Sequence, residues 1–207
     1  AGATVPRVSL GPLSRPDVVM FLCETLRGQA EDVGALATLI LEKTDGNPFF
    51  VIQFLKALHQ EGLFRFDSAR GAWSFRMETI AAAGMTDNVI DLMTRKIRRL
   101  SVGAQHVLTL AACIGSPFEW RTLLTVSRQA EEAAAARLAE SIDAGLIQPA
   151  AGQHAAYAFL HDRVQQAAYD LIPDEQKRRT HLDVARLLLA ECGPAVPDDR
   201  LFAVVSH

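Results

Sequence analysis

The sequence predicts a mainly α-helical fold of two or three small units with short β-hairpins. Apolar residues recur at spacings of three and four along most of the chain, which is the period of amphipathic helices. Two short segments alternate instead with a period of two around turn residues, as hairpins do. The chain has 207 residues, 49% apolar and 22% charged, and it exceeds the usual span of one compact domain, roughly 100 to 200 residues.

Three helices are predicted in the first part of the chain, after residues 7–13, which alternate like a short strand. Ser14 is suited to cap the first helix, because a serine oxygen accepts hydrogen bonds from N–H groups of the first turn. Pro48 suits the first turn of the third helix, where a missing N–H costs nothing. We expect these helices at 14–28, 32–44 and 48–62, as one small bundle.

A β-hairpin and a second group of helices are predicted next. Residues 62–75 alternate on both sides of a Ser-Ala-Arg-Gly turn. Further helices are expected at 86–100, 103–114, 119–127 and 131–144, followed by two short strands around 149–153. Three helices and a closing hairpin are the order of a winged helix. Helix resumes at 161–171, breaks at Pro173 and restarts at Asp174.

Charge and cysteine content exclude several classes of protein. A formal net charge of −3 and a pI near 6.1 indicate no general affinity for nucleic acid or anionic lipid. Cys23, Cys113 and Cys192 lie far apart among apolar residues, so we interpret them as buried hydrophobic residues of a cytoplasmic protein. The longest apolar runs fall short of the ~20 residues of a spanning helix, and no signal segment opens the chain. We therefore predict no membrane span.

The winged-helix order raises the possibility of DNA binding, and the sequence argues against it. The helix that would enter the major groove, in 129–145, carries four acidic residues against the single Arg137. Such a helix repels phosphates. The basic groups TRKIRR and QKRR are interpreted as solvated helix faces.

Catalytic motifs are missing from the sequence. It contains no GxxxxGK[ST] phosphate loop, no GxGxxG, no GxSxG and no HExxH. The adjacent His161 and Asp162 leave open an HD-type metal-dependent phosphohydrolase, in which such a pair binds a divalent ion. His106 is the plausible upstream ligand, but no second ligand lies near it and the residues before His161 have a strand pattern.

Four blocks of the sequence resemble successive parts of the STAND class of AAA-related P-loop ATPases. In order they are LGPLSRPDVVMFLCETL, TDGNPFFVIQFLKALHQEGLF, TDNVIDLMTRKIRRLSVGAQHVLTLAACIG and YAFLHDRVQQAAYDLIPDEQKRRTHLDVARLLL. The resemblance covers nearly the whole chain. It is closest to the ATPase module of large bacterial signalling proteins that join a serine/threonine kinase domain to a sensor histidine kinase.

The resemblance implies a mainly α fold with a small helical lid bundle, a winged-helix domain with short β-hairpins, and the start of a helical-repeat region. The implied domains are a remnant of the nucleotide-binding core with its last strand at 1–13, the lid at 14–84, the winged helix at 85–172 and the repeat-like region at 173–207. The chain starts without Met and stops inside an apolar segment, so we expect a fragment. Its expected partners are the missing N-terminal core and neighbouring signalling domains.

Four residues of this chain match the family's nucleotide-binding positions, and a fifth supports one of them. The GxP segment that approaches the base matches Gly46, Asn47 and Pro48, and Pro offers a flat apolar face to a purine. The family's histidine that contacts the β-phosphate of ADP matches His161, and Asp162 supports the helix start beside it. Without the resemblance, Gly46–Pro48 is a helix stop and start, Asp162 favours the helix dipole and His161 is half-buried.

The implied function is that of a lid and winged-helix portion of an ATPase switch in a signal-transduction protein. ATP and ADP are the expected cofactors, with Mg²⁺ ligands outside this chain, and the fragment alone is expected to be inactive while its parent is an ATPase or kinase. A helical protein-interaction module without a nucleotide role and the metal-dependent phosphohydrolase remain the alternatives.

Overall fold

The fold comes from a computed structural model that describes residues 10–83, 89–151 and 155–192. These residues form ten helices, five short strands and two small antiparallel sheets, which confirms the mainly α-helical fold class. The chain divides into two compact units, residues 1–89 and 90–207, and each is described by itself. Their assignment as lid and winged helix stays a prediction.

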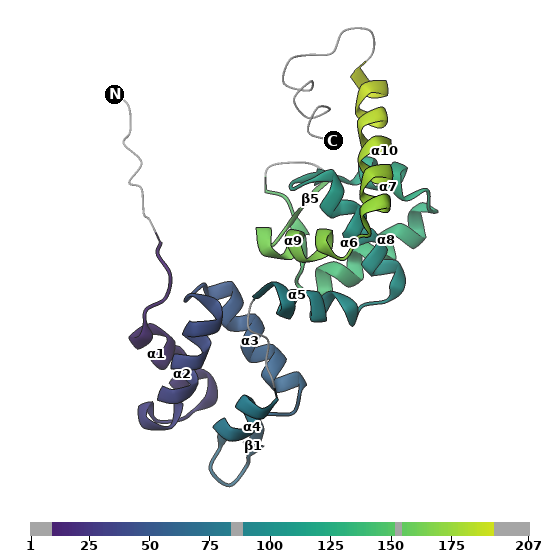
Figure 1. The fold of residues 1–207 in the computed structure, drawn as a ribbon. Helices are drawn as coiled ribbons and strands as arrows, with labels where there is room; N and C mark the ends of the chain where they lie inside the picture. The colour runs from purple at the N-terminus through teal and green to yellow at the C-terminus, as the bar shows by residue number, and fades with distance from the viewer. Residues whose placement is uncertain (1–9, 84–88, 152–154, 193–207) are drawn as a thin grey trace, which may run out of the picture. The chain divides into compact units, whose positions relative to one another are not determined.

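Three helices build most of the first unit: α1 (Arg15–Leu26), α2 (Ala30–Thr44) and α3 (Pro48–Gln60). Helix α2 contacts both α1 and α3 (Figure 1). Their facing sides bury Val18, Leu22, Leu36, Ile40, Phe54 and Leu58. Ser14 caps α1 as predicted, and its backbone N–H donates to the Asp17 carboxylate at 2.8 Å.

The segment before α1 differs from the strand predicted at 7–13. Residues 10–13 pair with no strand, and residues 7–9 lie outside the described part of the chain. The Leu13 N–H instead donates to the Gly46 carbonyl oxygen at 2.8 Å. An alternating pattern alone does not form a strand where no neighbouring strand offers a ladder of hydrogen bonds.

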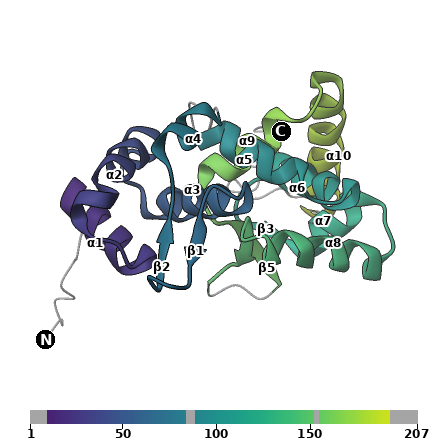
Figure 2. The same ribbon diagram turned by 90° about the horizontal axis from the view of Figure 1, so that it is seen from below.

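The predicted hairpin is present as β1 (Arg65–Asp67) and β2 (Ala72–Ser74), which run side by side in Figure 2. Phe66 faces Trp73 across the pair, with ring centroids 5.4 Å apart. The Asp67 carboxylate closes the turn by accepting from the Ala69 N–H at 2.9 Å. A short helix that the sequence analysis did not predict, α4 (Met77–Ala82), follows and buries Ile80.

Among the described residues, the second unit contains six helices and three short strands. The helices are α5 (Val89–Arg98), α6 (Val102–Ile114), α7 (Trp120–Ser127), α8 (Glu131–Asp143), α9 (Asp162–Asp170) and α10 (Asp174–Cys192). The strands are β3 (Phe118–Glu119), β4 (Ile147–Pro149) and β5 (Ala156–Phe159).

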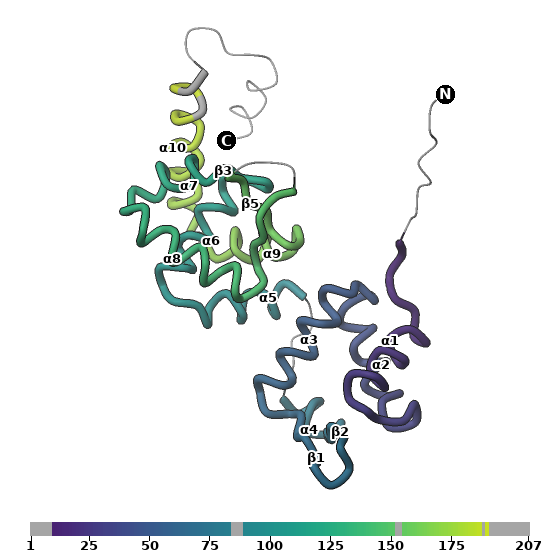
Figure 3. The backbone as a smooth tube through the Cα atoms, turned by 180° about the vertical axis from the view of Figure 1, so that it is seen from behind, coloured from purple at the N-terminus to yellow at the C-terminus, as the bar shows by residue number. Residues whose placement is uncertain are grey.

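Helix α6 lies at the centre of this unit and contacts α7, α8, α9 and α10 (Figure 3). It is apolar on most sides, which is typical of a helix surrounded by others. The sheet has the strand order β3-β5-β4, with Phe118 opposite Tyr157 and Ile147 opposite Phe159. Strand β5 therefore lies in the middle of the sheet, directly before α9.

The described cysteines Cys23 and Cys113 differ in burial. Cys113 is buried in α6, and burial raises the pKa of its thiol to about 11, against a smaller opposite effect of Lys177. Cys23 is only half-buried, so the interpretation as a buried residue is correct for Cys113 and incomplete for Cys23. Among the described residues, we find no helix with the length and apolarity that crossing a membrane requires.

The first turn of α6 is held by a carboxylate from α8. Glu140 accepts from the Ser101 N–H at 2.7 Å and from the Ser101 hydroxyl at 2.6 Å, and Ser101 Oγ in turn accepts from the Ala104 N–H at 3.2 Å. The two hydrogen bonds from Ser101 lower the pKa of Glu140 below its usual 4.5. A group with a lowered pKa contributes stability above its unfolded value, and the contribution is lost as the pH falls through the folded value.

Glu140→Gln should therefore lower the melting temperature of the second unit at about pH 7, and the difference from the native chain should shrink as the pH falls below 4.5. Thermal unfolding at several pH values measures this. Glu119→Gln, a change at an exposed glutamate outside this contact, is the control. A destabilisation by Glu140→Gln that is the same at every pH would show that the charge is not involved.

Candidate functional site

The first group of predicted site residues lies in the turn between α2 and α3. Helix α2 ends at Thr44, its C-cap residue Asp45 has left-handed backbone angles, and Gly46 follows with φ +71°. A β-carbon on Gly46 would collide with the Leu13 carbonyl oxygen and lie 3.2 Å from the Leu13 nitrogen. Only glycine meets both demands, the positive φ and the close approach of another backbone segment.

Asn47 and Pro48 start α3. The Asn47 side chain caps the helix by accepting from the Phe49 N–H at 3.0 Å. Pro48 occupies the first helical position and is exposed, whereas Gly46 is buried and Asn47 is half-buried. The turn therefore places one apolar ring at the surface of the first unit, beside the N-terminus of a helix. An exposed proline ring of this kind can lie against a planar apolar group such as a purine.

The second group lies where β5 passes into α9. His161 is the N-cap residue of α9, with extended backbone angles, and its imidazole is 27% exposed. Asp162 is the first helical residue and its side chain is 81% exposed. The Arg163 N–H lies 2.7 Å from Asp162 Oδ1 and 3.2 Å from His161 Nδ1. Both predicted residues thus contribute acceptors to the first turn of the helix.

The position of the proton on His161 decides what the ring can donate. His161 Nδ1 is in close contact with Asp162 Oδ1, and a protonated Nδ1 donates to that carboxylate. An unprotonated Nδ1 accepts from the Arg163 N–H instead, and the proton of the neutral ring is then on Nε2. The imidazolium and the neutral ring protonated on Nε2 both carry an Nε2 proton suited to an anionic oxygen, whereas a neutral ring protonated on Nδ1 has no donor at Nε2.

The two groups belong to different compact units. Gly46, Asn47 and Pro48 are adjacent in the first unit, and His161 and Asp162 are adjacent in the second. The structure thus brings together the residues of each group, which are neighbours in the sequence. Binding of one nucleotide by both groups stays a prediction.

The phosphohydrolase alternative requires further metal ligands close to His161. Within residues 10–83, 89–151 and 155–192, no group of three or more His, Cys, Asp or Glu side chains is placed to hold a metal ion. His106 lies half-buried in α6, and burial is the main reason that its pKa is lowered, with a further effect of Arg137. The described residues therefore do not support the phosphohydrolase alternative.

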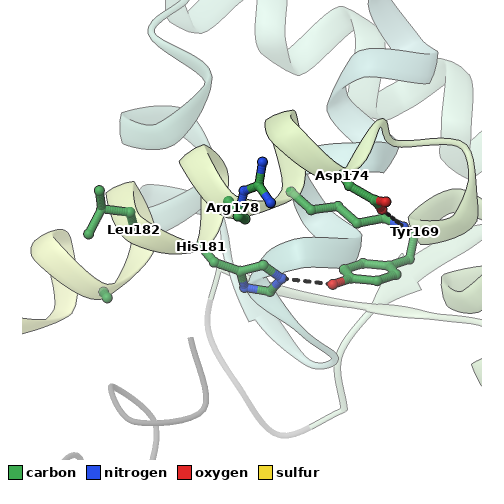
Figure 4. Close-up of a pocket in the computed structure, with 7 residues that line it drawn as sticks. Tyr169, Asp174, Arg178, His181 and Leu182 are labelled. Atoms are coloured by element: carbon green, nitrogen blue, oxygen red, sulfur yellow. Dashed lines mark hydrogen bonds and ion pairs between the residues drawn. The ribbon is translucent and has the colours of Figure 1, made fainter.

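An open hollow of about 670 Å³ lies between α9 and α10, and the sequence analysis did not foresee it (Figure 4). The Tyr169 hydroxyl and His181 Nε2 are 3.1 Å apart, and Lys177 Nζ is 4.7 Å from the Tyr169 ring centroid. Burial lowers the pKa of His181. The hollow is lined by Tyr169, Asp174, Lys177, Arg178, His181, Leu182 and Ala185. Its contacts hold α10 to α9 across the break at Pro173.

Comparison with known proteins relates the chain to a signalling protein. It is 30% identical over 218 aligned residues to a protein of Dictyostelium discoideum named hybrid signal transduction histidine kinase G. The alignment covers 88% of this chain and only 6% of that much larger protein. No protein-family model matches the chain. The chain is therefore distantly related to one segment of a hybrid signal transduction histidine kinase.

Proposed function

We propose that this chain is the lid and winged-helix portion of a STAND-type ATPase module in a multidomain signal-transduction protein. In this proposal the first unit is the lid, and the second unit is the winged helix with the start of a helical-repeat region. The nucleotide-binding core and the kinase or sensor domains belong to the same longer polypeptide. The distant relation to a hybrid signal transduction histidine kinase supports the signalling context.

The position of His161 is the observation that carries the nucleotide role. This residue lies two positions after the end of the central strand β5, caps α9 and keeps part of its imidazole exposed. A helix N-terminus directs N–H groups and a positive partial charge toward an anion. An imidazole Nε2–H at the same point adds a donor suited to a phosphate oxygen. We assign this place to the β-phosphate of ADP.

Pro48 supports the assignment of the base to the first unit. Its ring is exposed at the start of α3, beside the buried Gly46 backbone. A purine against this ring would be held by its apolar face, while the nucleotide-binding core holds the phosphates and Mg²⁺. ADP would then connect core, lid and winged helix, and exchange for ATP would release the winged helix. A ligand drives such a change only through different affinities for the two states.

Nucleotide assays on the 207-residue chain and on the longer protein test this proposal. We expect no ATP hydrolysis by the chain alone, and Pro48→Ala in the longer protein should weaken ADP binding by about 3- to 10-fold. Pro173→Ala, at an exposed proline directly before α10, is the control and should leave ADP binding unchanged. Robust ATPase activity of the 207-residue chain would contradict the proposal.

A helical protein-interaction module is the second candidate. It is favoured by Leu182 and Leu189 of α10, which are 49% and 44% exposed and lie two turns apart on one helix face. Substituting both with glutamine separates the candidates. A loss of signalling in the longer protein with unchanged ADP binding would favour the interaction module.

A further inference from the structure

The connection between α5 and α6 presents a basic pair, one intervening residue, a serine and an apolar residue: Arg98, Arg99, Leu100, Ser101 and Val102. The two arginines and Ser101 are exposed, and Val102 is 83% exposed. A valine so far out of the core contributes nothing to packing at this point. The basic group TRKIRR, which includes Arg98 and Arg99, was interpreted from sequence as a solvated helix face. The proposed nucleotide role does not use it.

We propose that Ser101 is a phosphorylation site for a serine/threonine protein kinase that reads positive charge before its acceptor. Such a kinase binds the side chains three and two residues before the serine with acidic groups, and holds the following residue in an apolar pocket. Arg98, Arg99 and Val102 supply these three features in this order. The proposal is independent of nucleotide binding by this chain.

Ser101 is held in a way that couples its modification to the packing of α8. Its backbone is extended, with φ −56° and ψ 150°, as an acceptor in a kinase groove must be. Its hydroxyl donates to Glu140 at 2.6 Å. The Gln105 side chain also donates to the Leu100 carbonyl at 2.8 Å and holds the connection on α6. The kinase therefore acts on the form in which the connection has opened, and helix ends open most readily.

The reaction is an ordinary phosphoryl transfer from ATP. The bond between Ser101 Oγ and the γ-phosphorus forms while the bond from that phosphorus to the β,γ-bridging oxygen breaks. ADP leaves, and the hydroxyl proton passes to the catalytic base of the kinase. The product carries a charge of about −1.5 to −2 at neutral pH where the hydroxyl was.

A phosphate on Ser101 has two opposite electrostatic effects at the start of α6. A negative group at a helix N-terminus is favoured by the helix dipole. The Glu140 carboxylate occupies the place of the incoming phosphate, however, and two anions in direct contact repel each other. Glu140 must leave, so phosphorylation removes both hydrogen bonds that connect α8 to Ser101.

Phosphate incorporation into the full chain tests the first part of the proposal. The probe is the catalytic subunit of cyclic-AMP-dependent protein kinase with labelled ATP, and peptide mass spectrometry locates the label. Ser14 is the matched control, because it is also an exposed helix cap bonded to a carboxylate but has no arginine two or three residues before it. We expect label on Ser101 and not on Ser14. The double substitution Arg98→Gln and Arg99→Gln should abolish labelling of Ser101, and Ser101→Ala should remove the label from this position.

Glu140→Gln tests the coupling, since it keeps the side-chain length and removes the charge. We expect labelling of Ser101 to be about 3- to 10-fold faster in this variant, because the closed form is less favoured. Hydrogen exchange of the first-turn amides of α6 should become about 10-fold faster on phosphorylation of the native chain and change less in Glu140→Gln. Label on Ser14 as readily as on Ser101, or no label in either chain, would overturn the site. Unchanged exchange after phosphorylation would overturn its effect on α8.

Discussion

Gly46→Ala should lower the free energy of unfolding of the first unit by about 2–4 kcal/mol, from the left-handed backbone angle and from a collision with Leu13. At φ +71° an alanine pays the penalty of a left-handed backbone, about 1–2 kcal/mol. The added β-carbon also collides with the Leu13 carbonyl oxygen, and the Leu13 residue is held in place by the 2.8 Å hydrogen bond from its N–H to the Gly46 carbonyl oxygen. Relief of the collision requires that this hydrogen bond be broken or lengthened.

Gly62→Ala is the control for the backbone penalty. Gly62 follows α3 in the same unit with φ +70°, and no atom lies within 4 Å of a β-carbon built on it. We expect Gly62→Ala to lower the free energy of unfolding by about 1–2 kcal/mol, from the backbone angle alone. Urea denaturation of the native chain and both variants measures the difference. Equal losses for the two variants would show that the Leu13 backbone does not approach Gly46 in solution.

The structural need for Gly46 affects how its role in nucleotide binding is judged. The glycine is already explained by its φ angle and by the adjacent Leu13 backbone, so a loss of ADP binding in Gly46→Ala would follow from unfolding of the turn. Pro48 is exposed and can be changed at little cost in stability, since its substitution acts mainly through the unfolded state. The base-binding proposal therefore depends on Pro48.

Helix positions were predicted well wherever local signals mark a start. Ser14 and Pro48 marked the start of α1 and of α3, as these residue types stabilise first turns in any context. The start of α2 was placed late, at Asp32. The structure begins this helix at Ala30, because the Asp32 carboxylate lies 3.4 Å from the Gln29 N–H and forms a capping box with Gln29. The helix expected at 86–100 is described from Val89 onward, so its predicted start at residue 86 lies outside the described residues.

Elements that depend on distant partners were missed. Strand β3 has two residues and exists because Phe118 and Glu119 pair with β5, so no local pattern announces it. The predicted helix at 119–127 consequently begins one residue later, at Trp120. Helix α4 has six residues and only Ile80 is buried, so the segment has too few buried positions to show a helical period.

The site was predictable as separate short motifs and not as an arrangement. Sequence spacing gave the positions of His161 and Asp162 at a helix start, because strand and helix patterns meet there. The bond between Ser101 and Glu140 and that between Tyr169 and His181 join different helices, and their spacing in the sequence follows no helical period. Only the fold reveals such contacts.

His161→Ala should release ADP about 10- to 100-fold faster from the longer protein, if the imidazole donates to a phosphate oxygen. A hydrogen bond to a charged group contributes about 1.5–3 kcal/mol, which corresponds to this range. The measurement is the dissociation rate of a fluorescent ADP analogue chased with unlabelled ADP. Loss of the cap on α9 also follows from this substitution, because His161 Nδ1 accepts from the Arg163 N–H.

His161→Asn separates capping from phosphate binding. Asparagine is among the best N-cap residues and its amide oxygen can accept from the first turn of α9, but its side chain is shorter and lacks Nε2. We expect both variants to release ADP faster and only the alanine variant to unfold more easily, by about 0.5–2 kcal/mol. Fast release in the alanine variant with native release in the asparagine variant would assign His161 to helix capping alone. In that case His161 would not bind phosphate, and the second unit would have no proposed nucleotide contact. The relation to the signalling kinase would be unaffected.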